Sequence, residues 1–397
     1  MRKMRLISPY AGFLLFNLCF FMMDTTASYF TIYLNEIGLS KRMIGTINGM
    51  GSLCAMASQP ILGMLADQAR SKRRILQGLI LCTAVLYPLI LFNQNTVYIL
   101  VVFCLYCTVR RFQPSLNTSM SVEYAEQSGR AYGPIRMMGA IGYSLAMAVV
   151  AQISGLEGSG TRLTFFTYSA ICFLNVGLIF FLPPMSGHNH KSEGPTLSPL
   201  TILKNKPILA LILFQMLMSI SHGLYGSFFS IYFTSDMGGS NAAYGITLSV
   251  AAAIEIPFLF FTDKIIRRLG TRGTLLVIGT LSSLRWFLTY LAPTTGVLLV
   301  VQGLNFLNIV QTVAISLALN RLIAPQFKTT VQSLAVTFQS VVSVLVSSFL
   351  GGVMADLFGI RPLFFIAGVI ALATTVVFCL FIFRIIPDES RRLGDCA

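Results

Sequence analysis

The sequence predicts an all-α membrane protein in which twelve transmembrane helices form two pseudo-symmetric six-helix bundles. Of its 397 residues, 55% are hydrophobic and only 11% are charged, whereas charged residues make up about 25% of a soluble domain. A spanning helix needs about 20 apolar residues, so twelve spans use about 240 residues and leave only short loops. This composition excludes a soluble enzyme and leaves no room for a separate soluble domain.

Twelve apolar runs follow one another along the chain, and we expect each to cross the bilayer as a helix. One long polar stretch interrupts them near the middle of the sequence, between two sets of six runs. The runs cover residues 8–34, 41–66, 75–93, 96–121, 135–155, 162–183, 207–234, 242–263, 273–292, 295–322, 329–354 and 361–384. The expected organisation is an N-terminal bundle over 1–183, a cytoplasmic linker over 184–206, a C-terminal bundle over 207–386 and a cytoplasmic tail over 387–397.

The chain carries 28 Lys and Arg against 14 Asp and Glu, a net charge of +14. In a soluble protein such a surplus would suggest a nucleic-acid partner, but here the basic residues alternate from loop to loop. Twenty of them lie in segments on one side of the predicted spans, and four lie in loops on the other side. Because membrane proteins keep excess Lys and Arg in cytoplasmic loops, we expect a multi-pass plasma or inner membrane protein with both termini in the cytoplasm. No nucleic-acid partner is expected.

An acid followed by a basic run occurs after the second predicted span and again after the eighth, about half the chain length later. An Asp at a helix end, with Arg in the following loop, can hold neighbouring helix ends together in one conformation and release them in another. The alternative is ordinary positive charge in cytoplasmic loops beside an incidental acid. The predicted conformational latch comprises Asp67, Arg73, Arg74, Asp263, Arg267 and Arg268.

The first of these loops carries Gly63, Leu65 and Asp67 ahead of its basic run, and it therefore resembles the signature loop of the major facilitator superfamily. It departs from the family pattern at Ala69 and Arg70, where the family often has a second glycine. Within the superfamily, the chain is most similar to the branch that contains lactose permease and phenylpropionate permease. The segments that carry this similarity are 59–67, 132–143 and 279–285.

Few charged side chains fall within the predicted spans, and each is a candidate site residue because a charge at membrane depth is costly without a cavity or a partner. Asp24 lies in the first span and Glu255 in the eighth, and His222 is the only histidine in a span. Arg110 and Arg111 make the N-terminal half positive, which favours a substrate with a carboxylate or phosphate. Alternatively, one of these two arginines pairs with Asp24.

The fifth predicted span begins with Arg136, and Gly139 and Gly142 share a face of its helix that allows close packing. Resemblance to the lactose permease branch implies that Arg136 and Tyr143 bind the substrate, and it aligns Asn117 with an acid of that branch. Asn117 can exchange hydrogen bonds with a substrate but cannot neutralise Arg136. The alternative for Arg136 is a charge at the cytoplasmic edge of the membrane.

Glu255 is the only carboxylate deep within the predicted C-terminal spans. Its surroundings, and those of His222, are similar to the phenylpropionate permease group, and Arg285 matches an arginine of the family's ninth helix. The resemblance therefore implies proton coupling through Glu255, with Arg285 and His222 adjusting its affinity for the proton. The alternative is a static ion pair between Glu255 and Arg285.

Gln302, Asn305 and Asn308 share one face of the tenth predicted span, with Gln311 in line. The lactose permease pattern has titratable residues at the first three of these positions, so a proton relay of that type is absent here. The polar stripe either lines a hydrated pathway, in which Asn305 is a candidate substrate contact, or forms hydrogen bonds between helices.

These features predict a proton-coupled importer of a small organic solute, a sugar or glycoside, that works by alternating access. The alternatives are an importer of an organic anion such as an aromatic carboxylate, and an uncoupled facilitator or receptor-like membrane protein. We expect no catalysis, no cofactor and no metal, with the proton gradient as energy source. Cys104 and Cys107 lie in an apolar helix without a second ligand pair. The expected partners are the substrate, protons and membrane lipid, and the expected assembly is a monomer.

Overall fold

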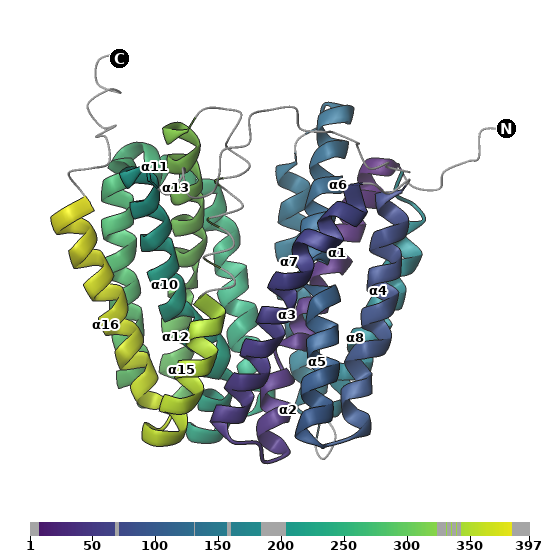
Figure 1. Cartoon of the computed structure of the whole chain (residues 1–397), viewed down its shortest axis with the longest axis horizontal. Helices are drawn as coiled ribbons and strands as arrows, with labels where there is room; N and C mark the ends of the chain where they lie inside the picture. The colour runs from purple at the N-terminus through teal and green to yellow at the C-terminus, as the bar shows by residue number, and fades with distance from the viewer. Residues whose placement is uncertain are drawn as a thin grey trace. The chain divides into compact units, whose positions relative to one another are not determined.

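The computed structural model describes residues 8–67, 71–130, 132–156, 160–183, 204–323 and 343–382, with the single positions 331, 335 and 339. The regular elements of these residues are all helices (Figure 1). They fall on the predicted apolar runs, because a helix satisfies its backbone hydrogen bonds within one segment and so suits lipid. The predicted C-terminal tail and most of the predicted linker lie outside the described residues.

The first six predicted spans correspond to α1 to α8, and three of these helices start at a short polar side chain. Ser8, Ser71 and Asn95 each accept a hydrogen bond from a backbone N–H of the helix that follows, which satisfies a donor that the first turn leaves free. The helices are α1 (Pro9–Ala27), α2 (Phe30–Glu36), α3 (Lys41–Asp67), α4 (Lys72–Leu89) with its 3-10 turn η1 (Ile90–Phe92), α5 (Thr96–Arg110), α6 (Gln113–Ser128), α7 (Gly133–Ser154) and α8 (Gly160–Ile179).

In the second half of the chain, the eighth and the ninth predicted spans are two helices that follow each other directly across a kink, and together they are labelled α11. Gly270 separates the two parts with φ at 66°, a left-handed conformation that glycine adopts without strain. Within the described residues, nine helices are long and apolar enough to cross a membrane. The helices of this half are α10 (Lys206–Ile231) with η2 (Tyr232–Asp236), α11 (Asn241–Leu291), α12 (Thr295–Gln302), η3 (Gly303–Asn305), α13 (Phe306–Leu322), α15 (Ser343–Phe358), α16 (Arg361–Val377) and η6 (Phe378–Ile382).

The helices pack as two compact units. Unit 1 comprises the described residues of 1–39, 47–191 and 239–249, and unit 2 comprises those of 40–46, 192–238 and 250–397. In unit 1, α1 packs against α7 and α8, and in unit 2, α10 packs against α15 and α16 (Figure 1). Two short segments, the first turns of α3 and α11, thus belong to the unit formed mainly by the other half of the chain.

The first turn of α3 is held in unit 2 by a carboxylate of α15. The two oxygens of Asp356 accept hydrogen bonds from the backbone N–H groups of Lys41 and Arg42, each at 2.8 Å. Close backbone packing accompanies this cap, because a Cβ at Gly45 would lie 2.1 Å from the carbonyl oxygen of Ser348. In unit 1, the first turn of α11 is held in a similar way: the Asn241 amide donates to Thr161 Oγ1 at 3.1 Å.

We expect Asp356→Ala to lower the free energy of unfolding by about 1 kcal/mol, since two N–H groups at a helix N-terminus lose a charged acceptor. Thermal unfolding of the purified protein in detergent measures the effect. Asp356→Asn, which keeps one acceptor oxygen, should fall between the wild type and Asp356→Ala. Equal stability of all three proteins would contradict the cap.

Candidate functional site

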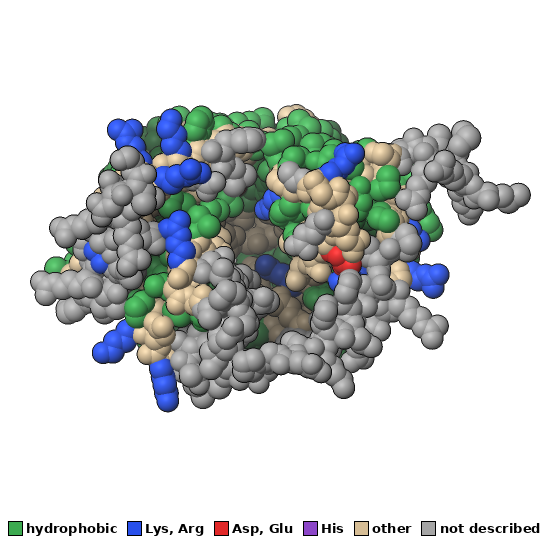
Figure 2. All heavy atoms as spheres, turned by 90° about the horizontal axis from the view of Figure 1, so that it is seen from above, with side chains coloured by type: hydrophobic (Ala, Val, Ile, Leu, Met, Phe, Trp, Pro, Cys, Tyr) green, Lys and Arg blue, Asp and Glu red, His purple; other side chains and the backbone are tan. Residues whose placement is uncertain are grey.

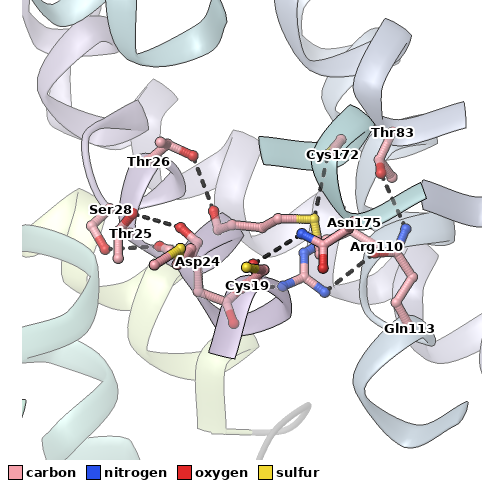
Figure 3. A network of polar contacts seen from close by, with 12 residues as sticks. Cys19, Asp24, Thr25, Thr26, Ser28, Thr83, Arg110, Gln113, Cys172 and Asn175 are labelled. Carbon is pink, nitrogen blue, oxygen red and sulfur yellow. Dashed lines mark hydrogen bonds and ion pairs between the residues drawn. The ribbon is translucent and has the colours of Figure 1, made fainter. Parts of the chain in front are cut away.

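An ion pair between a buried and a partly exposed side chain forms the centre of the polar cluster in unit 1. Asp24 of α1 pairs with Arg110, the last residue of α5 (Figure 3). The Arg110 side chain is 7% exposed and the Asp24 side chain 40%, so the arginine is buried while the aspartate is partly exposed. Of the two neighbouring arginines in this span, it is therefore Arg110 that pairs with Asp24, whereas Arg111 is exposed.

Amide and aromatic groups complete the surroundings of Arg110. Gln113 accepts a hydrogen bond from Arg110 Nη1 at 3.5 Å and donates to Thr83 Oγ1 at 3.1 Å (Figure 3). The guanidinium lies 5.3 Å from the centre of the Phe20 ring, a cation–π arrangement. The buried cation is tolerated because its charge is paired with Asp24 and two of its three nitrogens have partners within unit 1, whereas Nε has none.

Asn117, a candidate substrate residue, belongs to a separate hydrogen-bonded network between α1 and α6. Its amide donates to Asn17 Oδ1 at 3.0 Å, and the Asn17 amide donates to Ser121 Oγ at 3.2 Å. All three side chains are buried. Sequence reasoning missed Asn17 and Ser121, although the spacing of 117 and 121 places both residues on one helix face.

The other two candidate substrate residues of this half lie along α7. Arg136 is exposed, and its guanidinium lies 4.8 Å from the centre of the Phe21 ring. Tyr143 is half-buried and close to Tyr29. Arg136 and Asn117 therefore contact different residues of α1, Phe21 and Asn17.

The polar cluster of unit 2 is centred on Arg285, which is 2% exposed. Its Nη2 donates a hydrogen bond to Gln302 Oε1 at 2.5 Å. The guanidinium also lies 5.0 Å from the ring centre of Tyr225 and 4.5 Å from that of Trp286. Glu255 lies close enough for the two charges to interact.

Each charge of this pair is held by an amide of the tenth predicted span. The Asn305 amide donates a hydrogen bond to Glu255 Oε1 at 2.5 Å, and the Gln302 amide oxygen accepts one from Arg285. The helix is interrupted between α12 and α13 by the 3-10 turn η3, which contains Asn305. Two residues of the predicted polar stripe thus position the two charged groups, and Glu255 and Asn305 are half-buried.

Aromatic side chains form one wall of the cluster in unit 2. The His222 ring lies 5.6 Å from the Tyr225 ring and 5.9 Å from the Trp286 ring, measured between centres. The rings of Tyr225 and Trp286 are 5.4 Å apart. His222 was predicted to belong to the site, whereas Tyr225 and Trp286 were missed, although Trp286 follows Arg285 directly and is the only tryptophan of the chain.

The structure describes the side chains of only some of the predicted latch residues. The side chains of Asp67 and Asp263 are outside the described part. Arg73 donates to the carbonyl oxygen of Leu182 at 2.7 Å, which joins the start of α4 to the residues after α8. Neighbouring Lys72, which was not predicted to take part, forms an ion pair with Glu123 at 3.0 Å. The remaining latch arginines, Arg74, Arg267 and Arg268, are exposed. Among the described residues, no group of three His, Cys, Asp or Glu could hold a metal ion.

Two apolar helical units, each with a charged and polar cluster among its helices, define a multi-pass membrane transporter of small solutes. Residues 10–366 match the model of the MFS_1 like family. The chain therefore belongs to this family of secondary transporters, within the major facilitator superfamily that its signature loop predicted.

Several proteins with similar sequences are permeases or transporters, not enzymes. The chain is 23% identical to the raffinose permease of Escherichia coli over 385 residues, which cover 92% of this chain and 90% of the permease. It is 24% identical to the "Probable 3-phenylpropionic acid transporter" of Escherichia coli over 72% of this chain and 75% of that protein. Maltose, melibiose and lactose permeases of other bacteria also match.

A solved structure shows the same fold at low sequence identity. The crystal structure of the nucleoside transporter NupG aligns with a TM-score of 0.80 and 16% identity, covering 94% of this chain and 98% of NupG. The major facilitator fold predicted from the sequence is thus confirmed.

Proposed function

We propose that the protein is a proton-coupled symporter that imports a sugar or glycoside by alternating access. The observation that carries this proposal is the cluster of unit 2, where amide, guanidinium and carboxylate groups meet aromatic rings. Such a mixture suits a neutral ligand that carries both hydroxyl groups and apolar C–H surfaces. The names of the similar raffinose, maltose, melibiose and lactose permeases support the same substrate class.

The charge arrangement within each unit argues against an anion as the main substrate. Arg110 is paired with Asp24, and Arg285 interacts with Glu255. The buried charge of Arg110 is therefore compensated by Asp24, and Glu255 is a negative charge near Arg285. An organic anion remains the second candidate, supported by the similar phenylpropionic acid transporter and by the exposed Arg111 and Arg136.

Glu255 is the proposed proton carrier. A carrier carboxylate must reach water from each side in turn and must exchange its proton against nearby positive charge. Glu255 is half-buried, receives a hydrogen bond from Asn305, and lies near Arg285. Protonation weakens its interaction with Arg285, so the charge state of Glu255 can bias the conformation of unit 2. Arg285 and His222 adjust the affinity of Glu255 for the proton, and the proton gradient supplies the energy for transport.

Both termini are proposed to lie in the cytoplasm of a plasma or inner membrane protein, with a monomer as the working unit. The excess of basic residues in alternate loops supports this orientation. Figure 2 shows one face of the molecule over which Lys and Arg side chains are spread, while Asp and Glu appear in one place.

Uptake into proteoliposomes tests both substrate class and coupling. Raffinose, maltose, melibiose, lactose and 3-phenylpropionate are offered with and without an inwardly directed proton gradient. Gradient-driven accumulation of at least one of the sugars is expected. Accumulation of 3-phenylpropionate alone would establish the anion alternative. Uptake at the same rate and to the same level with and without the gradient would establish an uncoupled facilitator.

Glu255→Gln is expected to abolish gradient-driven accumulation while it preserves exchange of labelled for unlabelled substrate, because the amide retains hydrogen bonding but carries no proton. Glu36→Gln, which changes an exposed carboxylate at the end of α2, is the control and should accumulate substrate normally. Full accumulation by Glu255→Gln would remove Glu255 from the coupling mechanism.

A further inference from the structure

Three exposed cations lie on α11 just before its kink, and neither polar cluster nor the proposed function uses them. They are Lys264, Arg267 and Arg268, which we call the basic patch. Among the described residues, none of the three forms a hydrogen bond, an ion pair or a cation–π contact. Residues 261–272 as a whole contain four Lys and Arg against one Asp, so this segment carries a positive charge without an equal number of acids.

The helix brings the three charges of the basic patch close together. Arg267 and Arg268 follow Lys264 by three and four residues, and side chains at these spacings are neighbours on a helix surface, where like charges repel each other. Thr262 and Ile266 are buried on the other side of the same helix. The cations therefore face away from the packed helices of unit 2, and an anion that lies over them relieves their repulsion.

Exposed apolar side chains adjoin the basic patch. Phe261 is 55% exposed and Leu269 is 43% exposed, and Phe261 shares a helix face with Lys264 and Arg268. Phe261 belongs to the predicted span 242–263, whereas the basic patch lies between this span and the next. An apolar group toward the membrane interior, followed by cations at its edge, is the order in which a phospholipid presents its acyl chains and its phosphate. A free phosphate ion would gain nothing from Phe261.

We propose that the basic patch binds the headgroup of an anionic phospholipid, with the phosphate over Lys264, Arg267 and Arg268 and an acyl chain along Phe261. Basic residues at the cytoplasmic end of a spanning helix attract anionic lipid, and a guanidinium can hold a phosphate through two hydrogen bonds. The proposed orientation of the protein places this lipid in the cytoplasmic leaflet. The inference is independent of the substrate that is transported.

Lipid titration of the full-length protein in detergent tests the proposal. Native mass spectrometry counts the bound molecules of phosphatidylglycerol and, separately, of phosphatidylcholine with the same acyl chains. The Kd of the first phosphatidylglycerol should be at least about tenfold lower, because each nearby basic residue adds to the attraction. Rising salt should reduce this difference, since it screens exposed charges. Glycerol 3-phosphate, a phosphate ester without acyl chains, should not displace the lipid.

A variant that replaces all three residues of the basic patch with glutamine tests the location. Its Kd for phosphatidylglycerol should rise by at least about tenfold, toward the value for phosphatidylcholine. The matched control removes the same charge from three other exposed residues on the predicted cytoplasmic side, as Arg130→Gln/Lys204→Gln/Lys206→Gln. This control should keep the wild-type preference for phosphatidylglycerol.

Several results would overturn the proposal. These are equal wild-type affinity for the two lipids, a preference that salt does not reduce, and a folded patch variant that keeps the preference. An equal loss in the patch and control variants would show that overall positive charge attracts the lipid, and displacement by glycerol 3-phosphate would show a free-phosphate site. Should the patch variant fail to fold, Arg268→Gln takes its place, with Lys204→Gln as its control and the same criteria.

Discussion

Asp24→Ala is expected to lower the free energy of unfolding by about 3 kcal/mol, the lower end of the cost of removing one partner of a buried ion pair because Asp24 is partly exposed to solvent, and to abolish transport. The Arg110 side chain is 7% exposed, so without Asp24 its charge remains within the helices of unit 1 beside uncharged groups such as the Gln113 oxygen and the Phe20 ring. Thermal unfolding in detergent, together with uptake into proteoliposomes, measures both effects.

The double variant Asp24→Asn/Arg110→Gln provides the control. It removes both charges and keeps hydrogen-bonding groups of similar shape, so most of the lost stability should return. If transport returns with stability, the pair serves the fold of unit 1. If transport stays absent, the charges act in substrate binding or in the transport cycle. An Asp24→Ala protein as stable as the wild type would show that Asp24 is not the counter-charge of Arg110.

Gly142→Val is expected to prevent normal packing of α1 against α7 and to destabilise unit 1 by about 3 kcal/mol, at the upper end of the range for overpacking. A Cβ at this position would lie 2.0 Å from the carbonyl oxygen of Leu18, which is backbone and cannot rotate away. The two helices would have to separate along their contact. Thermal unfolding and the yield of folded protein from the membrane measure the effect.

Gly177→Ala in α8 is the matched control for that variant. A Cβ at Gly177 meets nothing within 4 Å, and alanine has the higher helix propensity. This protein should be at least as stable as the wild type. A stable and fully active Gly142→Val protein would show that α1 and α7 do not need the close approach that the structure gives them.

The membrane class and the helix positions could be predicted because both depend on local properties of the chain. A span requires only a run of apolar residues of sufficient length, and this requirement can be checked one segment at a time. The interruption at Gly270 also follows from the sequence, since the predicted spans end at 263 and resume at 273. The grouping of the first turns of α3 and α11 with opposite halves could not be predicted, because it depends on contacts such as Asp356 with Lys41.

The candidate site was only partly accessible to the same reasoning. Asp24, Arg110, Glu255 and Arg285 stand out because charged side chains are rare within apolar runs. Among their partners, Gln302 and Asn305 were predicted as part of a polar stripe, whereas Gln113, which bonds Arg110, does not stand out as an amide in the sequence. Arg110 and Arg111 are adjacent and equally charged, and only the rotation of α5 about its axis decides which of them reaches α1.

The sequence by itself determined that this chain is a helical membrane transporter of the major facilitator type. The length of the apolar runs, the charge of the loops and the signature loop each depend only on consecutive residues of the chain. The tertiary structure decided which charges meet, which amides hold them, and that Trp286 and Tyr225 stand beside Arg285. The physical reason is that these partners come from different helices, such as Asp24 and Arg110. Their meeting depends on how helix faces are rotated and packed, which no local pattern specifies.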